Sequence, residues 1–212
     1  MKIFSTLLLS TSLILSLSSQ SFASEYKVDP AHSSVNFSIR HLVSKVTGGF
    51  KDFDGEFNFD DKKPEATTGT FTAKTDSINT DNAKRDEHLK SEDFFDAKKN
   101  PTLTLTIKKL TKHGKDKFKA MGDLTMRGVT KPITLDVDYN GSTMFMGGKR
   151  SGFTATGVVN RKDFGINWNK ALDQGGYILG DEVSLTLNIE SGEKKADENK
   201  KLEKKEEEKK AK

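Results

Sequence analysis

Residues 102–107 read Thr-Leu-Thr-Leu-Thr-Ile, so that a threonine and a large aliphatic residue alternate. Successive side chains of a β-strand point to opposite faces, and this alternation therefore predicts a strand with one polar and one apolar face. The threonines would face water and the aliphatic side chains would face a core. Other segments of the chain have the same pattern as this stretch.

The same period of two recurs before and after residues 102–107. Its apolar positions are Val35, Phe37, Ile39, Phe57, Phe59, Phe71, Ala73, Phe118, Ala120, Leu124, Met126, Ile133, Leu135, Val137, Tyr139, Phe153, Ala155, Val159, Val183, Leu185, Leu187 and Ile189. Segments of this length and pattern are typical of half-buried strands. We predict about eight antiparallel strands from them.

Short connections rich in glycine or asparagine separate these strands, as sequential hairpins require. The predicted turns are residues 112–115, 127–130, 140–142 and 179–181. The segment from Asn79 to Asn100 differs, because it is strongly charged and has Leu89, Phe94 and Phe95 as apolar anchors. We predict one or two short helices there, with Thr80 as a helix N-cap.

A long sheet with one apolar face must cover that face, and closing into a barrel also removes its edges. The predicted fold is therefore all-β with a small helical insertion, an antiparallel eight-stranded β-barrel. Such a barrel is either filled by side chains or wide enough for one small ligand. Small inward residues either leave room for a ligand or accommodate neighbouring phenylalanine rings: Gly55, Ala73, Ala120, Gly122, Ala155 and Gly157.

Composition excludes several classes of function. The chain has no cysteine, which excludes disulfides, thiolate metal sites and cysteine nucleophiles. Its formal net charge of +4 comes mostly from the two ends, and residues 24–192 carry 25 basic and 24 acidic side chains. A protein that neutralises phosphates needs a surplus of basic residues, so we expect no nucleic-acid partner.

Both ends of the chain differ from its body. Residues 1–23 have a basic start, an apolar run over residues 7–17 and small residues before Ser24, which predicts a signal peptide cleaved after Ala23. The apolar run is too short for a stable membrane span. Residues 193–212 are almost wholly Lys, Glu, Ala and Asn, which predicts a charged, disordered tail. We expect a periplasmic or secreted protein whose tail solubilises it or tethers it to an anionic surface.

Several stretches of the body resemble the YceI-like family of secreted bacterial proteins. They are Val28-Asp29-Pro30-Ala31-His32, residues 35–42, Gly49-Phe50, Arg85-Asp86-Glu87-His88-Leu89, Phe94-Phe95-Asp96, residues 122–130, residues 160–165 and residues 180–183. The resemblance implies that residues 24–192 form a lipocalin-like barrel that holds a long polyisoprenoid lipid, such as a polyprenyl phosphate or an isoprenoid quinone, without chemistry on it. It also implies that the protein forms a homodimer.

The expected ligand site has an apolar lumen and a polar rim. The lumen residues are Val35, Phe37, Ile39, Phe57, Phe71, Leu105, Phe118, Leu135, Phe153, Val159, Leu185 and Leu187. The rim candidates for binding a head group are Arg40, His41, Arg85, Asp86, His88, Arg161 and Trp168. Arginine can hold a phosphate through two parallel hydrogen bonds. The alternative is that Arg85 with Asp86, and Arg161 with Asp163, form structural ion pairs.

Two further kinds of site have less support in the sequence. The histidines His32, His41 and His88, with Asp86 or Glu87, offer metal-ligand types but no ligand spacing.

Ser33 or Ser34, with His32 and Asp29, offers the residue types of a catalytic triad, but the Gly-x-Ser-x-Gly elbow is absent. We therefore expect no catalytic residue, metal or cofactor. The expected function is that of an exported protein that carries or stores a polyisoprenoid lipid. The alternative is a ligand-free, stress-related scaffold with a packed barrel.

Overall fold

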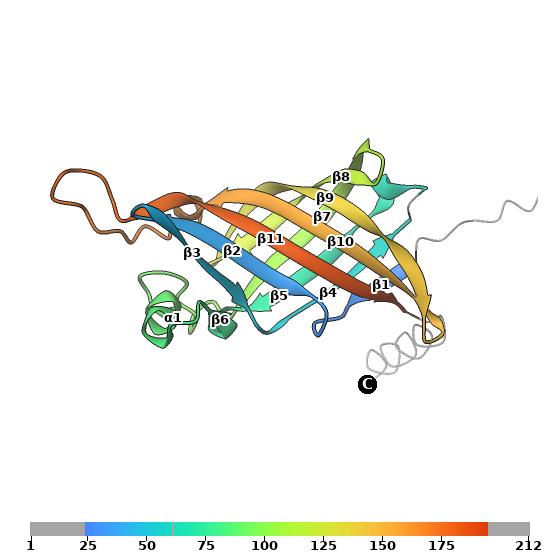
Figure 1. Ribbon diagram of the computed structural model, residues 1–212, viewed down its shortest axis with the longest axis horizontal. Coiled ribbons are helices and arrows are strands. Elements are labelled where there is room, and N and C mark those ends of the chain that lie inside the picture. Colours follow the sequence, from blue (N-terminus) through green and yellow to red (C-terminus); the bar gives the residue numbers. More distant parts are fainter. Residues whose placement is uncertain (1–23, 61, 195–212) are drawn as a thin grey trace, which may run out of the picture.

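The computed structural model describes residues 24–60 and 62–194, which form one antiparallel sheet with a single α-helix (Figure 1). The strands are β1 (Ser24–Val28), β2 (Ser34–His41), β3 (Ser44–Phe50), β4 (Phe53–Phe59), β5 (Gly69–Lys74), β6 (Ile78–Asn79), β7 (Thr102–Gly114), β8 (Lys117–Met126), β9 (Val129–Phe145), β10 (Gly148–Asn160) and β11 (Leu179–Glu193). The helix is α1 (Ala83–Lys90), and short 3-10 helices are η1 (Pro64–Ala66), η2 (Thr75–Ser77) and η3 (Arg161–Phe164).

The predicted signal peptide, residues 1–23, lies outside the described residues, and so do residues 195–212 of the predicted tail. Of the two residues between, Glu193 belongs to the sheet, and the Lys194 N–H donates to the Glu25 carbonyl at 2.8 Å. Glu193 ends β11, and Lys194 Nζ lies 2.8 Å from Glu56 Oε2. Strand β11 thus continues one residue past the predicted start of the tail, and it is paired with β1 up to Glu193.

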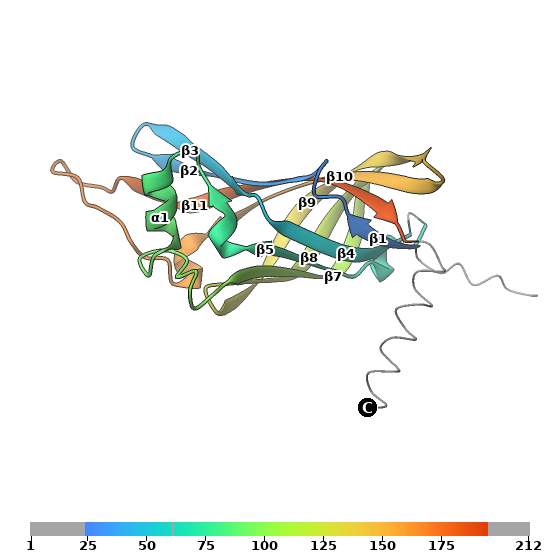
Figure 2. The same cartoon turned by 90° about the horizontal axis from the view of Figure 1, so that it is seen from below.

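Eight strands close into a ring in the order β1-β4-β5-β7-β8-β9-β10-β11, and β11 pairs back with β1. The prediction of a closed, antiparallel eight-stranded barrel is confirmed. The ring is fastened by the pairs Tyr26 with Glu193 and Val28 with Ser191. Strands β2, β3 and β6 continue the sheet beyond β11, toward the end of the barrel where α1 lies (Figures 1 and 2).

Strand β11 pairs with two different strands along its length. The chain turns between β1 and β2, so that β11 pairs with β2 over its first part and with β1 at its end. The chain turns again between β3 and β4. The sequence pattern did not predict β1 or β3. Strand β3 is hidden by Gly48 and Gly49, which interrupt the alternation of large apolar residues.

Aromatic side chains pack the barrel near the β1–β11 closure. Phe57 stacks on Tyr26 with ring centroids 5.4 Å apart, and Phe153 meets Phe57 and Phe59 edge to face at 5.4 and 5.1 Å. Tyr26 is fully buried. Buried aromatic side chains remove more apolar surface from water than any others. This end of the barrel is therefore filled by the protein itself.

The inserted segment contains one helix, and its N-cap is Asn82 rather than Thr80. The Asn82 side chain accepts a hydrogen bond from the backbone N–H of Arg85 at 3.0 Å. Thr80 instead donates its N–H and its hydroxyl to the buried carboxylate of Asp86. The prediction named the wrong cap because Thr80 and Asn82 are both common N-cap residues and only the contact with Asp86 distinguishes them.

Two predicted turns lie inside strands. Residues 140–142 belong to β9, where the register shifts by one residue opposite Gly152 and Phe153. Such a shift is a β-bulge, which uses the same residue types as a turn. Residues 179–181 belong to β11, which also changes register there. The turn at Arg127 and Gly128 is confirmed, and the connection of β7 to β8 lies at residues 115–116, at the edge of its predicted range.

Candidate functional site

A cavity of about 620 Å³ occupies the barrel on the α1 side of the aromatic packing. Its wall is almost wholly apolar and comes from most of the strands. A volume of this size lies within the range of about 300 to 1,000 Å³ that is typical of small-ligand sites. The cavity follows β11 from Val183 to Ile189, a length of about 20 Å at 3.3 Å per residue. An elongated apolar ligand fits this shape.

Nine of the twelve predicted lumen residues line this cavity: Val35, Phe37, Ile39, Phe71, Leu105, Leu135, Val159, Leu185 and Leu187. Phe57 and Phe153 line a second, smaller cavity of about 80 Å³. Phe118 is buried against Phe59, with ring centroids 6.2 Å apart, and lines neither cavity. Period two identified which side chains face inward, but it carries no information on which end of the barrel is packed.

The sequence missed cavity residues that lie outside the alternating strands. Phe50 ends β3, Phe95 belongs to the segment after α1, and Ile178 precedes β11. Phe95 had been identified as an apolar anchor, and its ring meets Phe50 edge to face at 5.9 Å. The sequence signal for Phe95 was thus a large apolar residue within a charged segment. Such a residue is expected to be buried, but the sequence does not show which cavity it lines.

The interior glycines accommodate neighbouring side chains. A Cβ atom on Gly55 would lie 2.4 Å from the ring of Phe71, and one on Gly157 would lie 2.5 Å from Leu135 Cδ2. Both distances are far below van der Waals contact. At these two positions the structure supports the alternative in which small residues make room for large neighbours, and residues of α1 and β2 contribute to the cavity wall.

The basic side chains that line the cavity are carried by α1, the end of β2 and the start of η3, and α1 lies at one end of the barrel (Figure 2). They are His41 at the end of β2, Lys84, Arg85 and His88 on α1, and Arg161 at the start of η3. The cavity therefore has an apolar interior and one basic end. This is the arrangement in which a long apolar chain lies inside and a polar or anionic group lies near the basic residues.

Arg85 and Asp86 do not form the predicted ion pair, and both contact Thr80 instead. Arg85 donates from Nε to Thr80 Oγ1 at 2.7 Å and from Nη2 to the Thr80 carbonyl at 2.8 Å. Asp86 accepts the Thr80 hydroxyl at 2.6 Å. Asp86 is buried and does not line the cavity, so it holds α1 in place and is no rim residue.

Arg161 is buried and is held mostly by backbone carbonyls. Its guanidinium donates to the carbonyls of Ile166 and Trp168 at 2.8 Å and of Gly180 at 2.9 Å. Its ion-pair partner is Asp181 at 3.4 Å, not the predicted Asp163. Burial lowers the pKa of Arg161, against the opposing effect of Asp181. With these donors engaged, Arg161 braces the loop that carries Trp168.

Three rings pack together at the α1 end of the cavity. His88 meets Trp168 edge to face at 4.9 Å and Phe94 at 5.0 Å, and Phe94 lies 5.2 Å from Trp168. The His88 ring is oriented by Asp93, whose carboxylate lies 2.8 Å from His88 Nε2. The rim candidates His88 and Trp168 therefore both line the cavity at this end, where they pack together.

The remaining rim candidates differ from each other. His41 lines the cavity, whereas Arg40, its neighbour on β2, points to the other face of the strand. Arg40 donates from Nη1 to the carbonyl of Leu42 at 2.9 Å, and it supports the β2–β3 turn. Of the two rim candidates on β2, His41 therefore lines the cavity and Arg40 does not.

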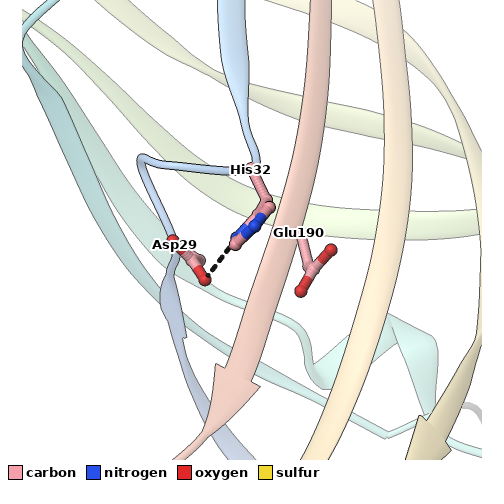
Figure 3. Close-up of side chains that lie close together, drawn as sticks. All are labelled: Asp29, His32 and Glu190. Carbon is pink, nitrogen blue, oxygen red and sulfur yellow. Dashed lines mark hydrogen bonds and ion pairs between the residues drawn. The ribbon is translucent and has the colours of Figure 1, made fainter.

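The histidines that were weighed as metal ligands are not brought together, because His41 and His88 lie at the cavity while His32 lies at the bend between β1 and β2. His32 is instead grouped with Asp29 and Glu190, as Figure 3 shows. Their ligand atoms lie within 4.8 Å of one another, a set of residue types that could hold a divalent ion. The Arg150 guanidinium, 3.3 Å from Asp29 Oδ2, already supplies positive charge there.

Hydrogen bonding shifts the pKa values of this cluster. The bond between His32 Nδ1 and Asp29 Oδ2, 3.0 Å long, lowers the pKa of Asp29 and raises that of His32. The residue types of a catalytic triad do not form one here, because Ser33 donates its hydroxyl to the Glu190 carbonyl at 3.2 Å and accepts from the Glu190 N–H at 2.9 Å. Ser33 thus ties the bend to β11.

Within residues 24–60 and 62–194, no helix is long and apolar enough to cross a membrane.

Comparison with known proteins adds family and fold. A YceI-like domain profile matches residues 26–191. Protein YceI of Escherichia coli O157:H7 is 42% identical over 177 residues, which cover 82% of this chain and 89% of that protein. The crystal structure of a Campylobacter jejuni YceI protein has a TM-score of 0.65 at 36% identity, over 74% of this chain and 91% of that one.

A more distant structure has the same fold. It is a polyisoprenoid binding domain from Saccharophagus degradans implicated in plant cell wall breakdown. Its TM-score is 0.58 at 14% identity, and the match covers 82% of this chain and 100% of that one.

Proposed function

This chain belongs to the YceI-like family, and on that premise we propose that it binds one long polyisoprenoid lipid in the barrel cavity. The ligand class is a polyprenyl phosphate or an isoprenoid quinone. The protein holds it for carriage or storage and performs no reaction on it. We further propose that this takes place in the periplasm or outside the cell, since residues 1–23 have the pattern of a cleaved signal peptide.

The observation that carries the proposal is the apolar cavity of about 620 Å³ with a single basic end. Removing one methylene group from water contributes about 0.8 kcal/mol. Several isoprene units would gain more than about 10 kcal/mol in gross transfer energy, which exceeds the lower estimates of the cost of association. The size and apolar character of the cavity thus support a long hydrocarbon ligand over a small polar one.

The basic end supports a preference for ligands with a polar or anionic head. The Lys84 side chain lines the cavity and forms no hydrogen bond or ion pair with another described residue, while Arg85 keeps part of its guanidinium free beyond its two bonds to Thr80. A phosphate group would accept hydrogen bonds from both. A quinone ring would instead pack on the rings of His88 and Trp168.

Mass spectrometry of an organic extract tests the proposal. Protein purified without detergent is extracted, and we expect a prenyl lipid in near one-to-one ratio with protein. Emptied protein should then take up a labelled polyprenyl lipid again. Protein that is consistently empty and takes up no prenyl lipid would contradict the proposal and favour a ligand-free scaffold.

A matched pair of variants on β11 locates the binding site. Leu185 points into the cavity, and Thr186 is exposed on the opposite face. We expect Leu185→Trp to fill part of the cavity and reduce the bound lipid at least about tenfold, while Thr186→Trp binds as the wild type does. Equal uptake by the two variants would mean that the lipid binds elsewhere.

A further inference from the structure

Two hairpin tips lie side by side at the α1 end of the cavity, next to its lining residues His41 and Ile178. One is the turn between β2 and β3, and the other is formed by residues 169–178, where Ala171 and Tyr177 pair as an isolated bridge. The backbone N–H of Leu42 donates to the Ile178 carbonyl at 2.8 Å, which joins the bases of the tips. Figures 1 and 2 show both tips projecting beyond the barrel at the α1 end.

These tips expose apolar side chains that none of the described residues covers. Val43 is fully exposed, Tyr177 is 55% exposed, and Leu42 and Leu172 are 43% and 38% exposed. We call these four residues the mouth patch. An exposed group of apolar side chains of this kind marks a surface that contacts a partner or a membrane.

The backbone at the β2–β3 turn strengthens this interpretation. Leu42 has a φ of +51°, in the left-handed region that asparagine and glycine normally occupy in two-residue hairpin turns. A bulky leucine there costs energy locally, and its exposed neighbour Val43 gains nothing from packing. Sequence choices that are unfavourable for the isolated fold indicate that this turn is used in a contact.

The charge around the mouth patch favours an anionic partner. Residues 40–45 carry Arg40 and Lys45 and no acidic residue, and residues 169–178 carry Lys170 against Asp173. Lys84, on α1, lines the adjacent opening. Apolar tips flanked by basic residues are the usual composition of surfaces that rest on anionic lipid head groups.

We propose that the mouth patch docks on an anionic lipid bilayer and holds the cavity opening against it, so that a lipid passes between bilayer and cavity without crossing water. This inference rests on the proposed function and adds where the ligand is exchanged. Val43 and the leucines enter the apolar edge of the bilayer, Tyr177 lies at the interface, and Arg40 and Lys45 contact the head groups.

A second exposed apolar tip lies at the opposite end of the barrel and supplies a matched control. Met144, Phe145 and Met146 are 70%, 57% and 86% exposed at the β9–β10 turn. None of the three lines either cavity. Met146 also has a left-handed φ, of +50°. Exposure and backbone conformation therefore do not distinguish the two tips, whereas the adjacent cavity distinguishes the mouth patch.

Sedimentation with vesicles tests the docking surface. The wild type should bind vesicles of phosphatidylcholine with phosphatidylglycerol, bind pure phosphatidylcholine less, and lose binding at about 1 M salt, where charges are screened within about 3 Å. The double variant Val43→Ser, Tyr177→Ser should bind at least about tenfold more weakly. The control Met144→Ser, Met146→Ser should bind as the wild type does.

Three outcomes would overturn the inference. They are a wild type that does not bind anionic vesicles, a control variant that loses binding while the mouth variant keeps it, and a mouth variant that changes only from dimer to monomer in sedimentation velocity. The last result would assign the mouth patch to contact between two copies of this chain.

Transfer kinetics separate this inference from the proposed function. We expect the mouth variant to take up a fluorescent farnesyl lipid from dilute solution as the wild type does, and to take it up more slowly from vesicles. Equal rates from vesicles would overturn the docking inference while leaving lipid binding intact. Failure of the wild type to take up the lipid from solution, with vesicle binding retained, would instead reject the proposed function.

Discussion

His32 and Asp29 form a hydrogen-bonded pair at the bend between β1 and β2. Asp29 also accepts the backbone N–H of Ala31 at 3.0 Å and lies 3.3 Å from Arg150 on β10. The Asp29 carboxylate therefore stabilises the turn between β1 and β2 and connects it to Arg150 on β10. The bend depends on a group that titrates.

Titration of this pair gives a prediction at the scale of single residues. Nuclear magnetic resonance of the His32 imidazole should give a pKa above the ordinary value of 6.5, because the hydrogen bond to Asp29 stabilises the charged ring. Replacing the carboxylate by Asp29→Asn should return the pKa toward 6.5. A His32 pKa unchanged by this substitution would contradict the assigned partner.

The sign of the pH effect on stability follows from the two directions. Because the His32 pKa is raised in the folded state, its contribution to stability is complete below pH 6.5 and is lost as the pH rises through the folded pKa. Because the Asp29 pKa is lowered, its contribution to stability is present above pH 3.8 and is lost as the pH falls through the folded pKa. Wild type should therefore exceed His32→Gln in stability most clearly between those limits. Urea unfolding across this range measures it.

The partners of polar residues were the least predictable feature at this scale. Arg161, a rim candidate, lines the cavity, but its partner Asp181 is twenty positions away and its other acceptors are backbone carbonyls. A carbonyl is present at every residue, so the sequence has no signal that singles out Ile166 or Gly180. Residue type was predictable here, and contact was not.

At the scale of elements, the alternation of large and small inward residues decides where side chains fit. Gly55 on β4 faces the ring of Phe71 on the neighbouring β5, and Phe71 lines both cavities. The ring can occupy this place only because residue 55 has no side chain. The packing between the two cavities therefore depends on one glycine.

Adding a methyl group at Gly55 tests this packing. A Cβ atom there would lie 2.4 Å from Phe71, so Gly55→Ala must displace the ring. We expect a loss of about 1 to 3 kcal/mol in the free energy of unfolding, measured with urea. The control Gly148→Ala, whose nearest neighbouring atom would be 4.0 Å away, should change stability far less. Equal losses would show that the ring moves freely.

Strands were predictable where their inward face carries large residues. The alternation of polar and apolar residues identified much of β2, β7, β8 and β11, since burial of one face of a strand imposes that pattern. It failed at residues 140–142, where asparagine and glycine form a bulge. A turn and a bulge need the same backbone freedom, so residue type alone cannot separate them.

At the scale of the whole molecule, the barrel is packed at one end and hollow toward the other. Aromatic rings fill the end near the β1–β11 closure, and the cavity extends from there to α1. Empty apolar volume lacks dispersion contacts and weakens a fold, whereas an occupied cavity restores them. The stability of this protein should therefore depend on its ligand.

Thermal unfolding measures this dependence. At a lipid concentration about 100-fold above Kd, binding adds about 2.7 kcal/mol. For a domain of this size we expect a rise of about 5 to 10 °C in Tm relative to extracted protein. Thr186→Trp should show the same rise and Leu185→Trp should lose it. An identical Tm for loaded and extracted wild type would contradict lipid binding in the cavity.

The closure of the ring also determines how the chain could be reconnected. Tyr26 pairs with Glu193, and the N–H of Lys194 donates to the Glu25 carbonyl at 2.8 Å, so the first and last described strands are neighbours. Circular permutation joins such neighbouring ends and opens the chain at an exposed turn. A permutant cut at residues 115–116 would begin with β8 and keep every strand neighbour. We therefore expect the same barrel to form when its strands are synthesised in this different order.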